Sequence, residues 1–133
     1  MKKYMLIGLM GIAGAICRYL ISLLFQGSFP WGTLTVNILG CLLLPFVFIF
    51  IRELGFLSED LINAMGTGFV GAFTTFSSFS VEIIRMIENG KTAAAFTYLF
   101  VSTAGGFLAA YVSILFSYYA IRKFMKNHSF GNI

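Results

Sequence analysis

Long uncharged stretches alternate with short charged ones along this chain. No charged residue occurs in 19–51, 61–81 or 92–121. A helix needs about 20 predominantly apolar residues to cross the hydrocarbon layer, and an open strand edge finds no hydrogen-bonding partner in lipid. The stretches also lack the alternation of polar and apolar residues that barrel strands show. The pattern therefore predicts an integral membrane protein built from helices.

The first uncharged stretch is too long for one span and contains a turn signal. Gly27, Ser28, Pro30 and Gly32 favour a turn, and Trp31 is typical of a membrane interface. The chain then divides into four predicted spans within a single membrane domain, with no separate soluble domain. The domain covers 1–133, and its spans cover about residues 4–25, 32–51, 60–88 and 93–121.

Composition and charge agree with a membrane location. Only 11% of the residues are charged, against about 25% in soluble domains. The net charge of +4 does not indicate nucleic-acid binding, because the basic residues flank the spans, as the positive-inside rule describes. The two termini and the second loop hold six Lys and Arg and the opposite side holds two, so we expect cytoplasmic termini. The six are Lys2, Lys3, Arg52, Arg122, Lys123 and Lys126, and the two are Arg85 and Lys91.

The segment GAFTTFSSFS, residues 71–80, combines hydroxyl groups with aromatic rings inside the third predicted span. Glycines precede it, so we expect the helix to break at mid-membrane, where the freed backbone groups must face protein, water or an ion. Back-bonding of hydroxyls to their own helix and simple ring packing are the alternatives. Hydroxyl donors and positively polarised ring edges together suit a small dehydrated anion. The hydroxyls belong to Thr74, Thr75, Ser77, Ser78 and Ser80, and the rings to Phe73, Phe76 and Phe79.

Polar side chains also occur in the first two spans. Arg18 lies about two-thirds of the way along the first span, where an arginine either faces the bundle interior or extends to the interface. Asn37 lies in the second span and needs a partner. Its amide either joins two helices or donates to an anion. Each residue alone leaves both interpretations open.

The fourth span adds hydroxyls but no charge. Tyr98, Ser102 and Gly106 share one helix face, which places two hydroxyls in line and a gap at the glycine. No carboxylate is expected at mid-membrane, since Glu82 is expected at the boundary of the third span. Cation-binding and proton-coupled sites generally need a carboxylate at mid-membrane. The polar route therefore favours an anion or a neutral solute.

Three motifs in order resemble the CrcB/Fluc fluoride channels along nearly the whole chain. They are GIAGAICRY at 11–19, GTLTVNILG at 32–40 and GAFTTFSSFSVE at 71–82. The resemblance implies four-span subunits packed antiparallel in a dual-topology dimer, with two fluoride pores and a central structural sodium ion. The implied function is passive export of toxic fluoride across the cell membrane.

The resemblance also implies roles for individual residues. Phe76 and Phe79 would supply ring edges to the pores, and Asn37 would donate its amide to fluoride. Gly71 and Thr74 would offer backbone carbonyls to sodium. Arg18 would support the positive potential near a vestibule. The remaining polar lining would consist of Thr75, Ser77, Ser78, Tyr98 and Ser102.

Some features depart from the family pattern. Met10 and Pro45 replace glycines that are common there, and Gly106 lacks a hydroxyl that some members have; Pro45 is expected to kink its helix. The six-to-two charge bias is unexpected for a subunit that inserts both ways. A homodimer is the first expectation, and a heterodimer with a homologue of opposite bias is the alternative.

Three other classes of protein fit the sequence less well. A small multidrug exporter has a carboxylate in its first span, where this chain has Arg18. A purely structural membrane subunit would not need Asn37 together with the hydroxyls and rings of residues 74–79. An enzyme would need a metal constellation, an activated nucleophile or a phosphate loop, and none is recognisable.

Overall fold

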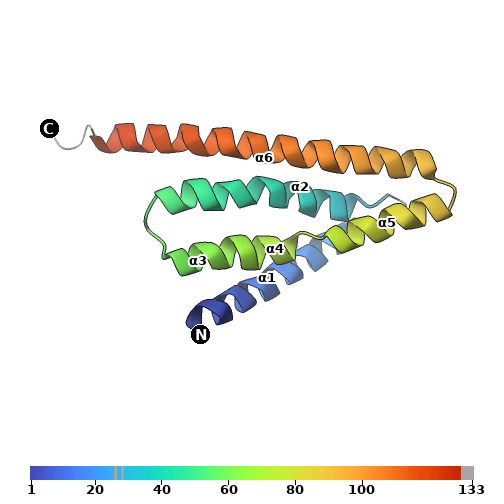
Figure 1. The fold of residues 1–133 in the computed structure, drawn as a ribbon, viewed down its shortest axis with the longest axis horizontal. Helices are drawn as coiled ribbons and strands as arrows, with labels where there is room; N and C mark the ends of the chain where they lie inside the picture. The colour runs from blue at the N-terminus through green and yellow to red at the C-terminus, as the bar shows by residue number, and fades with distance from the viewer. Residues whose placement is uncertain (26, 28, 130–133) are drawn as a thin grey trace.

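The computed structural model describes residues 1–25, 27 and 29–129. Four long helical stretches lie lengthwise beside one another, and the start of the first and the end of the last lie at the same end of the bundle (Figure 1). The first is α1, Lys2–Leu24, and the second is α2, Trp31–Pro45, continued by the π-helix η1, Phe46–Ile51. The third comprises α3 (Glu59–Asn63), the π-helix η2 (Ala64–Val70), α4 (Gly71–Phe73) and α5 (Phe76–Glu88). The fourth is α6, Thr92–Ser129.

The all-helical prediction is confirmed for the described residues, which contain no strand, and the number of candidate spans agrees with the four that the sequence predicts. Four stretches are long and apolar enough to cross a membrane: Lys2–Leu24, Trp31–Ile51, Glu59–Glu88 and Thr92–Lys126. α6 continues to Ser129, past the end expected at Ile121. Of the predicted turn before α2, Ser28 lies outside the described residues.

Glycines allow α1 to pack closely against η2. A Cβ atom at Gly14 would overlap the carbonyl oxygen of Phe69, and a Cβ atom at Gly68 would lie 2.5 Å from the carbonyl oxygen of Ile7. Membrane helices often pack through such small residues, because lipid supplies no hydrophobic force to press them together. This interface positions the third stretch, which carries the candidate site, against α1.

Pro45 changes the hydrogen-bonding pattern of the second stretch while the chain stays helical. Proline has no backbone N–H, so α2 ends there and the wider π-helix η1 follows. The Ser113 hydroxyl of α6 donates to the carbonyl oxygen of Leu42 over 2.6 Å. One side chain from a neighbouring helix therefore supports the irregular turn.

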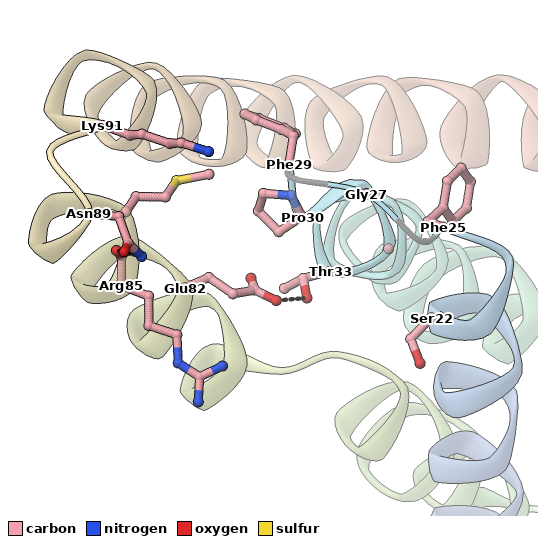
Figure 2. Close-up of a pocket in the computed structure, with 12 residues that line it drawn as sticks. Ser22, Phe25, Gly27, Phe29, Pro30, Thr33, Glu82, Arg85, Asn89 and Lys91 are labelled. Atoms are coloured by element: carbon pink, nitrogen blue, oxygen red, sulfur yellow. Dashed lines mark hydrogen bonds between the residues drawn. The ribbon is translucent and has the colours of Figure 1, made fainter.

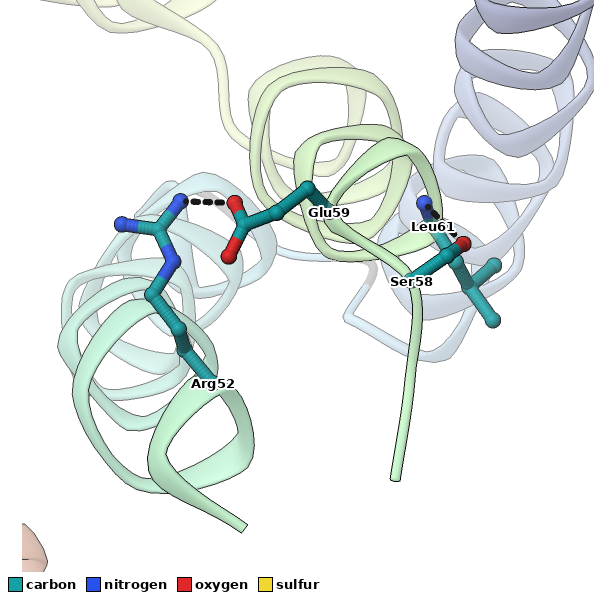
Figure 3. Close-up of polar contacts among 4 residues, drawn as sticks. All are labelled: Arg52, Ser58, Glu59 and Leu61. Carbon is teal, nitrogen blue, oxygen red and sulfur yellow. Dashed lines mark hydrogen bonds and ion pairs between the residues drawn. The ribbon is translucent and has the colours of Figure 1, made fainter. Parts of the chain in front are cut away.

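The connection between the second and third stretches is held by local polar contacts (Figure 3). Arg52 forms an ion pair with Glu59 over 3.0 Å. The Ser58 hydroxyl accepts a hydrogen bond from the backbone N–H of Leu61 and caps α3. Both partners of the ion pair are exposed, so the pair contributes little stability.

Tyr98 is the centre of the core between α2, α5 and α6. Its side chain is fully buried, with its ring centroid 5.4 Å from that of Phe29 and 5.2 Å from that of Phe79. Leu34 and Met86 belong to the same core cluster. Through Phe79, Tyr98 joins the start of α6 to α5, which begins at the helix break described next.

Candidate functional site

Two extended residues interrupt the third helical stretch. α4 ends at Phe73, α5 begins at Phe76, and Thr74 and Thr75 have ψ angles of 162° and 118°. The Thr75 hydroxyl caps α5 by accepting from the backbone N–H of Ser78 over 3.2 Å. A helix ends in partly negative carbonyls and begins with partly positive amides. The interruption therefore places a cation-attracting end and an anion-attracting end side by side.

Asn37 of α2 holds this interruption in place. Its Oδ1 accepts from the backbone N–H of Thr75 over 2.8 Å, and its Nδ2 donates to the Thr75 carbonyl over 3.0 Å. One amide thus satisfies both backbone groups of a buried residue that no helix satisfies. Asn37 joins two helices, and its Nδ2 carries a second hydrogen besides the one given to Thr75.

Three hydroxyls gather at the start of α5. The Thr75 hydroxyl donates to Ser78 Oγ over 3.0 Å and lies 3.3 Å from Ser77 Oγ. Thr75 is buried, whereas Ser77 is exposed. Ser80 does not join this group, because its hydroxyl donates to the Phe76 carbonyl one turn earlier. The cluster offers several donors around the positive end of one helix.

The two carbonyls expected to bind sodium lie at the end of α4. The Thr74 hydroxyl donates to the Val70 carbonyl over 3.1 Å and lies 3.4 Å from the Gly71 carbonyl, and the Thr74 carbonyl accepts from Arg18 Nη1 at 3.5 Å. The distances to the Gly71 and Thr74 carbonyls are at the long limit for hydrogen bonds, so both contacts are weak. Arg18 is half-buried and its guanidinium lies beside the Thr74 carbonyl, which favours the interpretation that it faces the bundle interior.

The two phenylalanines at the start of α5 differ in their surroundings. Phe76 is 80% exposed, while Phe79 packs against the buried ring of Tyr98. Their ring centroids are 6.0 Å apart. Phe79 is therefore fixed by the core, and Phe76 extends from the surface of the single chain.

Glu82 joins three helices, which the sequence did not indicate. Its Oε1 accepts from the Thr33 hydroxyl over 2.7 Å (Figure 2), and its Oε2 accepts from the Tyr98 hydroxyl over 2.8 Å. Thr33 lies one turn before Asn37, and Glu82 lies three residues after Phe79. This helical spacing was a usable signal, because each residue shares a face with a predicted site residue.

The predicted line of hydroxyls on α6 is divided between two environments. The Tyr98 hydroxyl is used by Glu82. The buried Oγ atom of Ser102 has no hydrogen-bond partner among the described residues. Sequence spacing placed both residues on one face, but it did not show that a carboxylate takes the first hydroxyl.

Three hollows lie around these residues. They are a groove of about 620 Å³, a middle hollow of about 230 Å³ and an outer hollow of about 330 Å³ (Figure 2), and the middle hollow shares lining residues with each of the other two. Thr75 lines the first two, and Thr33 lines the last two. The groove includes Asn37, Gly71, Thr74, Phe76, Phe79 and Ser102; the middle hollow includes Arg18 and Ser78; the outer one includes Glu82, Arg85 and Lys91. Ser77 and Tyr98 line none of the three.

Comparison with known proteins shows the family of this chain. A family model described as CrcB-like protein, Camphor Resistance (CrcB), matches residues 5–114. The chain belongs to the CrcB family. The match includes all three motifs at 11–19, 32–40 and 71–82, and it ends within α6.

Curated relatives of this CrcB-family chain are named as ion channels. The fluoride-specific ion channel FluC 2 of Listeria innocua serovar 6a is 41% identical over 121 residues, covering 90% of this chain and 94% of the relative. FluC 2 of Listeria monocytogenes serovar 1/2a is 43% identical over 106 residues, covering 79% and 82%. FluC 1 of Bacillus cereus is 36% identical over 124 residues, covering 90% and 86%. This CrcB-family chain is thus a multi-pass membrane protein of an ion-channel family and not an enzyme.

Proposed function

We propose that this chain forms a fluoride-selective channel that exports fluoride passively and lowers its toxicity in the cell. The observation that carries the proposal is the interruption at Thr74 and Thr75, bridged by Asn37 and open to a groove with Phe76 and Phe79. Relatives that share the surrounding motifs are named fluoride-specific ion channels. The first finding supports a site for a small anion, and the names of the relatives point to fluoride as that anion.

The chemistry of the groove suits a small, strongly hydrated anion. Such an ion needs hydrogen-bond donors and positive edges at several weak sites in series, so that it enters and also leaves. The amide of Asn37, the start of α5 and the phenylalanine ring edges supply them. Glu82 is a carboxylate that lines the outer hollow, and it already accepts hydrogen bonds from two hydroxyls. Neutral HF crosses lipid, whereas the fluoride it releases inside needs a channel to leave.

We place the interruption at mid-membrane and complete the groove with a second subunit in an antiparallel dual-topology dimer. The 80% exposure of Phe76 and the exposed backbone of Gly71 support this, because both belong to the groove wall. A homodimer is the simpler form. A heterodimer with a homologue of opposite Lys and Arg bias is the alternative that the charge distribution favours.

A structural sodium ion would fit the end of α4. The Gly71 and Thr74 carbonyls are weakly engaged within the chain, and carbonyl oxygens suit a hard cation. One chain supplies two of them, so two subunits would supply four. The partial negative charge of a helix end adds to the attraction. Sodium would there hold the two subunits together and is not itself transported.

Fluoride efflux from liposomes containing the purified protein tests the proposal, with chloride efflux measured in parallel. We expect rapid fluoride loss, no chloride loss, and an inactive Phe76→Ile variant. Phe100→Ile is the matched control: its ring is 73% exposed and lies on the face of α6 opposite Ser102, so its efflux should match that of the wild type. Equal chloride and fluoride rates would exclude a selective channel. A folded but inactive protein that becomes active with a homologous subunit would exclude the homodimer.

A further inference from the structure

α6 extends past the helix beside it. α2 and α6 run in the same direction (Figure 1), and matching positions are fixed by Phe29 with Tyr98 and by Phe46 with Phe116. In both pairs the residue of α6 comes about 70 positions later in the chain than its partner. Ile51, the last residue of η1, therefore lies level with the turn of α6 at 119–121. The rest of α6, to Ser129, therefore continues beyond the end of the second stretch.

The overhanging part begins where the hydrocarbon layer is expected to end. Trp31, at the start of α2, is 54% exposed and marks one interface. The turn of α6 that lies beside Trp31 comes about 20 residues before Tyr119. A helix of that length spans about 30 Å, which matches the thickness of the hydrocarbon layer. Tyr118 and Tyr119 are exposed and thus lie where aromatic residues mark the second interface.

The next turn of α6 carries three cations on one side. Arg122, Lys123 and Lys126 are exposed and fall within an arc of about 100° on the helix. Tyr118 and Tyr119 lie on the same side, one turn nearer the hydrocarbon. The order of aromatic and then basic side chains follows the order of interface and phosphate layer in a bilayer.

No described acidic residue pairs with these cations. The sequence has no Asp or Glu after Glu88, and no ion pair of Arg122, Lys123 or Lys126 occurs within the residues that the structure describes. At the same end of the bundle, Arg52 is paired with Glu59. The end of α6 therefore carries three cations, unpaired among the described residues, on one side of a helix, against the two, Lys2 and Lys3, at the start of α1.

We propose that the end of α6, residues 118–126, is a docking site for the headgroups of anionic phospholipids. Each basic residue near a membrane surface attracts such lipids, and the attraction acts over about a Debye length. Three basic residues on one side of the helix, at the depth of the lipid phosphates, form a local binding site and not a diffuse positive charge. The site lies outside the part of the chain that the family model matches, and the inference does not depend on fluoride transport.

Electron paramagnetic resonance of the full-length protein in phosphatidylcholine bilayers tests this. Trace spin-labelled phosphatidylglycerol or phosphatidylcholine reports the fraction of each lipid immobilised by protein. The wild type should prefer phosphatidylglycerol, and 1 M salt should abolish the preference. Arg122→Gln/Lys123→Gln/Lys126→Gln should lower the phosphatidylglycerol association constant by at least about fivefold. The matched control, Lys2→Gln/Lys3→Gln at the same end of the bundle, should stay within about twofold of wild type.

Several outcomes would contradict a lipid site at the end of α6. A triple variant that keeps the preference, or a control pair that loses it equally, would overturn the proposal. A photoactivatable phosphatidylglycerol should crosslink to residues 118–126, and crosslinks confined to other segments would also overturn it. If the triple variant instead changes the subunit count measured by light scattering, a second copy of the chain is the occupant and the lipid site is excluded.

Discussion

The second and third helical stretches each contain one interruption, and the chain handles the two differently. At Pro45 the backbone stays helical and widens into η1, with one hydroxyl from Ser113 supporting it. At Thr74 and Thr75 the backbone leaves the helix, and Asn37 and Arg18 contact it from two other helices.

The two interruptions also differ in their surroundings. Around Pro45 the neighbouring contacts are aromatic, with the Phe46 ring 5.1 Å from Phe50 and 6.3 Å from Phe116. Around Thr75 the chain leaves two hollows open on either side. An irregular backbone is tolerated at membrane depth only where protein buries it or where it lines a cavity. The second interruption fits the latter condition, whereas at Pro45 the backbone stays helical.

Asn37→Ala should have the largest effect, because it removes both hydrogen bonds to the Thr75 backbone. Leaving a buried N–H and a buried carbonyl unsatisfied should lower the free energy of unfolding by about 2 to 4 kcal/mol. SDS titration of the detergent-solubilised protein measures this. Asn89→Ala is the matched control: this exposed amide bonds only to the Arg85 carbonyl of its own helix, so its loss should cost less than about 0.5 kcal/mol. Equal effects of the two variants would mean that Asn37 does not hold the interruption.

Gly40→Ala should be the next most disruptive change. A Cβ atom at Gly40 would overlap Cγ2 of Thr74, so we expect a cost of about 1 to 3 kcal/mol from overpacking and slower fluoride efflux. Gly8→Ala is the control, since nothing lies within 4 Å of its Cβ position. There alanine should be neutral or stabilise α1 by up to about 1 kcal/mol. If both variants behave alike, contact between α2 and Thr74 does not shape the interruption.

Thr75→Val should have a smaller effect on stability and a distinct effect on the start of α5. It removes the cap of the Ser78 N–H and the contacts with two serine hydroxyls, at a cost of about 1 kcal/mol. Amide hydrogen exchange of 76–79 should accelerate more than that of 83–88. Thr75→Ser, which keeps the hydroxyl, should show little of this acceleration. Uniform acceleration through α5 would contradict a local capping role.

Ser113→Ala should have the smallest effect. Hydrogen bonds between membrane helices contribute on average about 0.6 kcal/mol, and the Leu42 carbonyl remains within a helical stretch. We expect a loss of that size in SDS titration and an unchanged rate of fluoride efflux. A loss of efflux comparable to that of Asn37→Ala would show that the two interruptions act together, and the contrast between them would fail.

The helical class, the number of candidate spans and the family can be predicted from the amino-acid sequence alone. Uncharged stretches of membrane length follow from composition alone, and the three motifs are local in the chain. The glycine and threonine content of 66–75 also indicated where the third stretch weakens. These features depend on short-range properties of the backbone and on the exclusion of charge from lipid.

The partners of the polar groups, by contrast, depend on how the helices pack against one another. The sequence showed that Asn37 needs a partner, but not that the Thr75 backbone is that partner. It placed Glu82 at a boundary and gave Tyr98 a lining role, whereas the folded chain joins the two and buries the tyrosine. Each of these pairings crosses from one helix to another. A buried polar group forms a hydrogen bond with whichever partner the packed helices bring within about 3 Å. That partner depends on how each helix is rotated against its neighbours, and neither sequence segment alone predicts this rotation.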